Sequence, residues 1–100
     1  RREGRNLHVD LPVTISEAAL GAKVEVPTLD GKATLTIPAG TQSGAKLRMK
    51  GKGVPDPKGG IRGDMYAHTQ IVVPKTPDAA ARKIFEALKE IEIDPRAGKF

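Results

Sequence analysis

Apolar and polar residues alternate along short stretches of the first three-quarters of this chain, which is the pattern of half-buried β-strands. Glycine, proline and aspartate residues between the stretches favour turns. The pattern predicts strands at residues 6–11, 23–26, 33–37, 46–49 and 65–73. In the first strand, Leu7, Val9 and Leu11 are expected to point inward. His8 and Asp10 are expected to point outward.

Prolines and glycines mark the expected ends of these strands. Pro12 has no N–H to donate to a neighbouring strand, so we expect it to end the first strand. Pro38 is expected to end the third strand in the same way. Asp30-Gly31 is a strong hairpin signal that joins the second and third strands. Residues 51–63 hold five glycines and two prolines without periodicity, which predicts a loop.

Two helical segments are predicted, one short and one near the C-terminus. Ser16 is a candidate N-cap for a helical turn at residues 17–20, and Gly21 suits the position after its end. Further on, Thr76 as N-cap and Pro77 at the first helical position predict the start of a longer helix. Its apolar stripe has helical spacing and comprises Ala81, Ile84, Phe85, Leu88 and Ile91.

Together these elements predict a mostly β fold. We expect a small β-sandwich of short antiparallel strands, with a short helical turn and one C-terminal helix. The expected parts are a β-sandwich domain at residues 1–75, a helix at 76–92 and a tail at 93–100. The apolar stripe of the helix has two open interpretations: it packs on the domain's own sheet, or it packs on a second subunit.

Composition narrows the class of protein. One hundred residues make one small domain with a thin core, and with 3% aromatic residues that core must be built from aliphatic side chains. No cysteine is present, so disulfides and cysteine-ligated zinc are excluded within this chain. We find neither a run of about 20 apolar residues nor a signal-peptide pattern. Because the chain begins at Arg1, we expect it to be excised from a longer protein.

The net charge of +5 is unevenly distributed. Six basic residues lie within residues 46–62, which contain one acid, Asp56. One interpretation is a solvated face that protects an edge strand, and the other is a contact with an acidic partner or nucleic acid. Stacking aromatics, which single-strand binding favours, are missing among these lysines in the sequence. The candidate contacts are Lys46, Arg48, Lys50, Lys52 and Lys58.

The sequence contains few residues that could act together in catalysis. His8 and His68 lie on different predicted strands, and we interpret each as an exposed or hydrogen-bonded histidine. Ser16 and Ser43 have no histidine nearby in sequence to act as a base. The glycine-rich segment 51–60 lacks the spacing of a phosphate-binding loop. We therefore predict a protein that is not an enzyme, with no cofactor and no metal.

Several motifs in a fixed order resemble a known family. They are EAALG, VPTLDG, IPAGTQSG, LRMKGKG and RGDMY, within about residues 1–92. The chain resembles the C-terminal substrate-binding region of the DnaJ/Hsp40 co-chaperones, and more narrowly the second of its two β-rich domains. The resemblance implies a cytoplasmic, homodimeric protein that binds unfolded client polypeptides and delivers them to Hsp70 through a J-domain of the parent protein.

The resemblance also implies candidate binding residues. An extended client segment would add to an edge strand, with alternate side chains on a groove lined by Val9, Leu11, Val24 and Val26. The alternative is that these four residues are ordinary core. Two other functions remain open: DNA binding, because some relatives bind curved DNA, and a spacer role between client-binding arms.

The tail is expected to lead into the dimerisation segment of the family. Phe85 and Phe100, the two phenylalanines of the chain, are therefore candidate dimer contacts. No membrane partner is expected.

Overall fold

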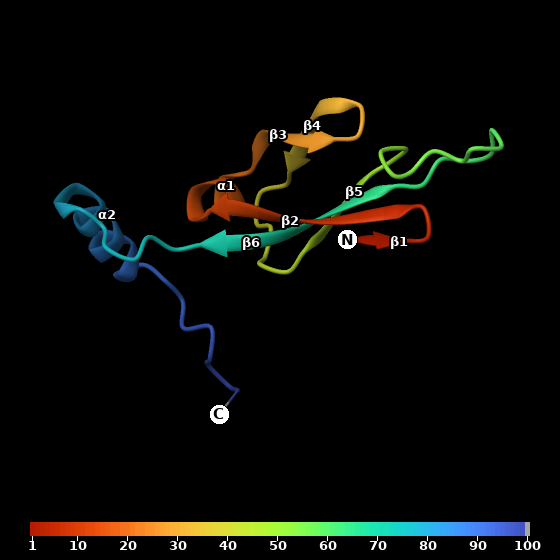
Figure 1. Cartoon of the computed structure of the whole chain (residues 1–100). Helices are drawn as coiled ribbons and strands as arrows, with labels where there is room; N and C mark the ends of the chain where they lie inside the picture. Colours follow the sequence, from red (N-terminus) through yellow and green to blue (C-terminus); the bar gives the residue numbers. More distant parts are fainter. Residues whose placement is uncertain (100) are drawn as a thin grey trace.

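The computed structural model describes residues 1–99 and consists of two β-sheets packed face to face, with a helix at one end (Figure 1). The mostly β class with short strands and a C-terminal helix is confirmed. The larger sheet has the strand order β1-β2-β6-β5, and the smaller pairs β3 with β4. The elements are β1 Arg2–Glu3, β2 Asn6–Thr14, α1 Ile15–Leu20, β3 Ala22–Thr28, β4 Gly31–Ile37, β5 Lys46–Met49, β6 Met65–Val72 and α2 Ala79–Lys89.

The longest pairing of the larger sheet is parallel, whereas the sequence predicts antiparallel strands. β2 pairs with β6 in register from Leu7↔Met65 to Thr14↔Val72. The other three pairings, β1–β2, β3–β4 and β5–β6, are antiparallel. A parallel pair needs a long crossover connection, which the hairpin, β5 and the following loop supply here. Alternation of apolar residues shows which face of a strand is buried but carries no information on its direction.

The first strand runs past Pro12 and ends at Thr14, so the predicted end at Pro12 is wrong. The Leu7 N–H donates to the Asp64 carbonyl beside β6, whereas the His8 N–H donates to the Arg1 carbonyl on the opposite side. Backbone groups alternate along a strand, so even-numbered positions of β2 point away from β6. The missing N–H of Pro12 therefore removes no bond from the β2–β6 ladder.

The N-cap of α1 is Thr14, not Ser16 as the sequence predicts. The Glu17 N–H donates to Thr14 Oγ1 at 3.0 Å, and the Thr14 N–H donates to Glu17 Oε1 at 2.9 Å. This reciprocal capping box lets the helix begin directly after the strand. Gly21 follows the helix with a φ of 81°, as the sequence predicts for its C-terminal end.

The cap of α2 also differs from the sequence expectation. Asp78, not Thr76, is the N-cap, and its Oδ1 accepts from the Ala81 N–H at 2.8 Å. Within α2 no residue is buried, and the helix lies beyond the end of the two sheets (Figure 1). Of its apolar stripe, Phe85 is partly covered, whereas Ile84 is 69% exposed.

The core lies between the two sheets and is aliphatic, as predicted, with two methionines in addition. Val26 and Leu35 from the smaller sheet pack against Met49, Met65 and Ala67 from the larger one. A second cluster joins Val13 of β2, Ala18 of α1 and Ile37 of β4. No aromatic side chain is among the buried hydrophobic residues of the described chain.

The hairpin predicted at Asp30-Gly31 is confirmed. β3 and β4 pair from Ala22↔Ile37 to Thr28↔Gly31, which leaves Leu29 and Asp30 at the tip. Gly31 adopts a φ of 102°, a conformation that favours glycine.

Candidate functional site

The four residues predicted to bind peptide lie between the two sheets. Val26 is 2% exposed and belongs to the core. Val9 and Leu11 of β2 and Val24 of β3 are half-buried and pack against that core. The structure therefore brings all four together. Their role in peptide binding stays a prediction.

One edge of β2 is open in the described part of the chain. β1 pairs only with its first two residues, through Arg2↔Leu7 and Glu3↔Asn6. Beyond His8, the side of β2 that faces away from β6 has no partner strand among residues 1–99. By the alternation of the strand, the N–H and C=O of Asp10 and the C=O of Pro12 point to this side. These groups can hydrogen-bond to an added strand.

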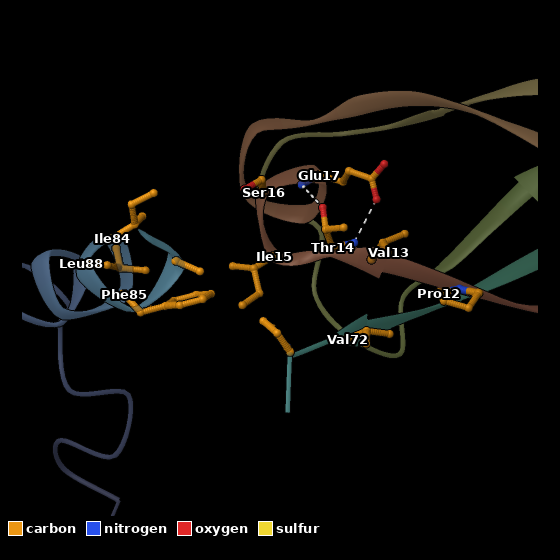
Figure 2. A pocket seen from close by; sticks show the side chains of 12 residues that line it. Pro12, Val13, Thr14, Ile15, Ser16, Glu17, Val72, Ile84, Phe85 and Leu88 are labelled. Carbon is orange, nitrogen blue, oxygen red and sulfur yellow. Dashed lines mark hydrogen bonds between the residues drawn. The ribbon is translucent and has the colours of Figure 1, made fainter. Parts of the chain in front are cut away.

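An apolar groove lies where this edge ends (Figure 2). It has a volume of about 650 Å³ and separates α2 from the end of the sheets. Phe85 of α2 points toward Ile15 of α1 and Val72 of β6 across it (Figure 2). Pro12 and Thr14 of β2 also line the groove, so it is continuous with the open edge.

The basic residues of 46–62 are spread over a strand and a loop. Lys46 and Arg48 lie on β5, whereas Lys50, Lys52 and Lys58 lie in the segment that follows it. Arg48 Nε is 2.8 Å from Asp64 Oδ2, so part of its charge is neutralised. In the sequence no aromatic residue lies among these basic residues, but in the structure one lies beside them. Tyr66 lies opposite Arg48 in the β5–β6 register, and Lys46 Nζ lies 4.9 Å from the centre of its ring.

Two carboxyl groups near this basic segment have perturbed pKa values. The backbone N–H of Gly51, at 2.8 Å, and the Arg48 guanidinium lower the pKa of Asp64 below its usual value of 3.8. The Arg62 guanidinium, 2.7 Å from Asp30 Oδ2, lowers the pKa of Asp30. Asp30 is at the hairpin tip, so this ion pair ties the smaller sheet to the loop after β5.

The two histidines, which the sequence places on different strands, are in contact. His8 Nδ1 lies 2.7 Å from His68 Nε2. His8 points away from the core as predicted, but it is only 8% exposed. The sequence signal for this contact was only that the two histidines lie on different predicted strands. Their proximity depended on the parallel register of those strands, which the pattern does not contain.

The described residues contain few groups arranged for chemistry. Ser43 Oγ accepts a hydrogen bond from the Ile71 N–H at 3.1 Å, and Ser16 lines the groove. Within residues 1–99 no group of three His, Cys, Asp or Glu side chains is placed to hold a metal ion. Neither helix in this range is long and apolar enough to cross a membrane.

Of the two candidate dimer contacts, only one can be located. Phe85 lines the apolar groove, and Phe100 lies outside the described residues. Sequence patterns missed the groove itself, because Ile15, Val72 and Phe85 come from three separate elements, α1, β6 and α2.

Comparison with known proteins identifies the class to which this two-sheet fold belongs. A family model described as the DnaJ C terminal domain matches residues 1–74, and the chain belongs to this family. It is 44% identical over 93 residues to the chaperone protein DnaJ of Erysipelothrix rhusiopathiae, covering 93% of this chain and 25% of that protein. The resemblance found in the sequence motifs is confirmed.

Two further relatives show the range of the family. The chaperone protein DnaJ of Ruminiclostridium cellulolyticum is 45% identical over 93% of this chain, which covers 24% of the relative. A curved DNA-binding protein of Coxiella burnetii is 44% identical over 94% of this chain, which covers 29% of that relative. The chain thus spans about a quarter of the length of these proteins, and its relationship supports a role related to DnaJ chaperones.

Proposed function

We propose that this chain is a non-enzymatic chaperone module that binds unfolded polypeptide in extended form along the open edge of β2. The observation that carries the proposal is the unpartnered side of this strand within residues 1–99, which leads into the apolar groove. Main-chain hydrogen bonds at such an edge are indifferent to client sequence, as a chaperone requires.

The predicted groove residues take part in this arrangement. A strand added beside β2 directs alternate side chains toward the inner face of the sheet. There they meet the partly exposed rims of Val9, Leu11 and Val24, while Val26 supports the floor from the core. Phe85 and Ile15 then receive apolar side chains beyond the end of β2. Each such contact is small, so binding is expected to be weak and tolerant of sequence.

Replacing Asp10 by proline tests the proposal. The Asp10 N–H points to the open side, so proline removes one donor for an added strand while it leaves the β2–β6 ladder intact. We expect the D10P variant to bind a reduced, alkylated and therefore unfolded protein about tenfold more weakly, measured by fluorescence anisotropy.

The matched control is Asp10→Ala, which keeps the N–H and removes the same carboxylate. It should bind as the native chain does. Equal affinity of D10P and D10A, with both variants folded by circular dichroism, would contradict binding by strand addition at this edge.

The remaining roles belong to the longer protein of which this chain corresponds to about a quarter. We infer that its clients are delivered to Hsp70 by that longer protein, in the cytoplasm. We also infer that the protein is a homodimer in which α2 and the segment after it contribute the contact. Ile84 of α2 is 69% exposed and Ile91 of the segment after it is 77% exposed, which supports an additional partner for the helix and this segment.

DNA binding is the second candidate function, favoured by the similarity to the curved DNA-binding protein and by Lys46 and Arg48 beside Tyr66. The salt dependence of binding distinguishes the two functions, because DNA binding releases counterions and apolar client binding does not. DNA binding should weaken steeply between about 50 and 200 mM salt, whereas apolar client binding should persist. If client binding were lost over the same range of salt concentration, the client would bind at the basic residues and not at the β2 edge.

A further inference from the structure

β5 is the second edge strand of the larger sheet, and one of its two sides is open. In the order β1-β2-β6-β5 it pairs with β6 alone among residues 1–99. The Thr69 N–H of β6 donates to the carbonyl of Ala45, directly before β5, at 2.9 Å. Because backbone groups alternate along a strand, the N–H and C=O of Lys46 and Arg48 point away from β6. This edge can therefore accept one more strand.

The side chains along this edge alternate between apolar and basic. Leu47 and Met49 lie on the core side of the sheet. Lys46, Arg48 and Lys50 alternate with them and are exposed. The two lysines form no ion pair within the described residues. Such an edge repels strands of like charge and favours a strand in which acids alternate with apolar residues.

The segment after α2 has this complementary pattern. Residues 90–94 have the sequence EIEID, in which acids alternate with isoleucines. Ile91 is 77% exposed and Ile93 is 89% exposed. The N–H groups of Ile93 and Asp94 have no backbone acceptor in the part of the chain that the structure describes. Pro95 favours an extended conformation at Asp94 and ends a strand there, since it has no N–H.

The two patterns match along their whole length when Glu92 is placed opposite Arg48. The isoleucines then lie beside the apolar residues of β5, and the outer acids lie beside the two lysines. This match holds for parallel and antiparallel pairing, because both patterns are symmetric about their central residue. In its own chain the segment leads away from the sheets (Figure 1). The occupant that fits this edge is therefore the same segment of a second copy.

We propose that residues 90–94 of one copy add as a fifth strand to the β5 edge of a second copy, reciprocally in a two-fold dimer. This proposal rests on the homodimer inferred above and assigns its contact. Main-chain hydrogen bonds form at Lys46 and Arg48, and the two-fold symmetry makes each contact twice. The turn bonds from the Ile91 and Glu92 N–H groups to the Leu88 carbonyl are given up in exchange.

Reversing the charges on each side of the contact tests the exchange. The variant E90K/D94K places lysines beside the lysines of β5, and the variant K46E/K50E places glutamates beside the acids. We expect each variant to raise the Kd of the dimer about tenfold, measured by sedimentation equilibrium. An equimolar mixture of the two variants should dimerise as tightly as the native chain, because every contact again joins opposite charges.

The matched control is K23E/K32E, which reverses two exposed lysines on the hairpin of β3 and β4. Mixed with E90K/D94K, it should not restore the dimer. Restoration by this control, or none in the mixture of the two edge variants, would overturn the exchange. An unchanged Kd in both edge variants would overturn the exchange but leave the homodimer in place. A native chain that stays monomeric would overturn both.

A second measurement uses the native chain alone, so it does not depend on the folding of a variant. As the protein concentration rises through the Kd, amide exchange at Lys46 and Arg48 should slow several-fold. Exchange at Asp10, on the open edge of β2, should keep its rate. Slowing at Asp10 with unchanged rates at Lys46 and Arg48 would place the segment on the β2 edge and overturn the proposal.

Discussion

At the scale of single residues, several polar side chains hold the loop between β5 and β6 against the rest of the molecule. Asp64 accepts from the Gly51 N–H and from Arg48, and Arg62 bonds to Asp30 and to the Gly53 carbonyl. The basic segment is therefore not only a free positive surface. Two of its arginines are engaged by carboxylates, Asp64 just after the segment and Asp30 at the hairpin tip.

This engagement predicts an acid dependence of stability. The pKa of Asp64 is lower in the fold than its usual value of 3.8, so its contribution is present above that value and is lost as the pH falls through the folded pKa. We expect Asp64→Asn to lose less stability than the native chain on acidification from about pH 5 to about pH 2.5, measured by thermal unfolding.

Arg48→Gln is the companion variant. It should flatten the acid dependence only in part, because the Gly51 N–H still favours the ionised carboxyl. Identical acid curves for all three proteins would show that Asp64 does not contribute in this way.

At the scale of elements, the ends of strands and helices depended on single backbone groups. α1 starts at the capping box of Thr14 and Glu17, directly after β2, and not at Ser16. β2 passes through Pro12 because that position faces the open edge. In both cases the residue type suggested a boundary nearby. For α1 the acceptor of the Glu17 N–H decided where it falls, and for β2 the missing N–H of Pro12 lies on the open side and does not end the strand.

The cap makes a direct comparison of two neighbouring hydroxyl residues possible. Thr14→Ala leaves the Glu17 N–H without its acceptor and should lower the free energy of unfolding by about 1 kcal/mol, measured in urea. Ser16→Ala removes an exposed hydroxyl that does not cap and should have almost no effect. If Ser16→Ala lowered the free energy of unfolding more than Thr14→Ala does, Ser16 and not Thr14 would be the N-cap.

At the scale of the whole molecule, the chain is elongated. Its radius of gyration is 17.5 Å, compared with about 13 Å for a compact domain of this length. The excess arises because α2 and the following segment extend from the two sheets (Figure 1). A helix with an apolar stripe and no buried residue has little reason to be stable alone. This shape supports the proposal that a second subunit covers it.

Sedimentation velocity measures this association. We expect the native chain to show a concentration-dependent dimer and Phe85→Ala to shift it toward monomer by at least several-fold in Kd, because truncation of a partly buried aromatic removes apolar contact area. Lys83→Ala, an exposed change on the same helix, should leave the dimer unchanged. A native chain that stays monomeric at high concentration would contradict the dimer for these 100 residues.

Local patterns predicted much of the fold and little of the candidate site. The strand at residues 46–49 has the predicted bounds, and the hairpin at Asp30-Gly31 forms, because both depend on neighbours in sequence. β1 was missed, because two residues are too few for a pattern. The groove and the histidine contact were missed because their parts are distant in sequence.

The sequence by itself determined the mostly β class, the aliphatic core and, through its ordered motifs, membership of the DnaJ C-terminal domain family. These properties follow from local periodicity, from composition and from residue identity. Only the tertiary structure decided that β2 and β6 run parallel, that one edge of β2 is open and that His8 meets His68. The physical reason is that strand direction and pairing arise from how the two sheets bury their apolar faces together, which no single segment specifies.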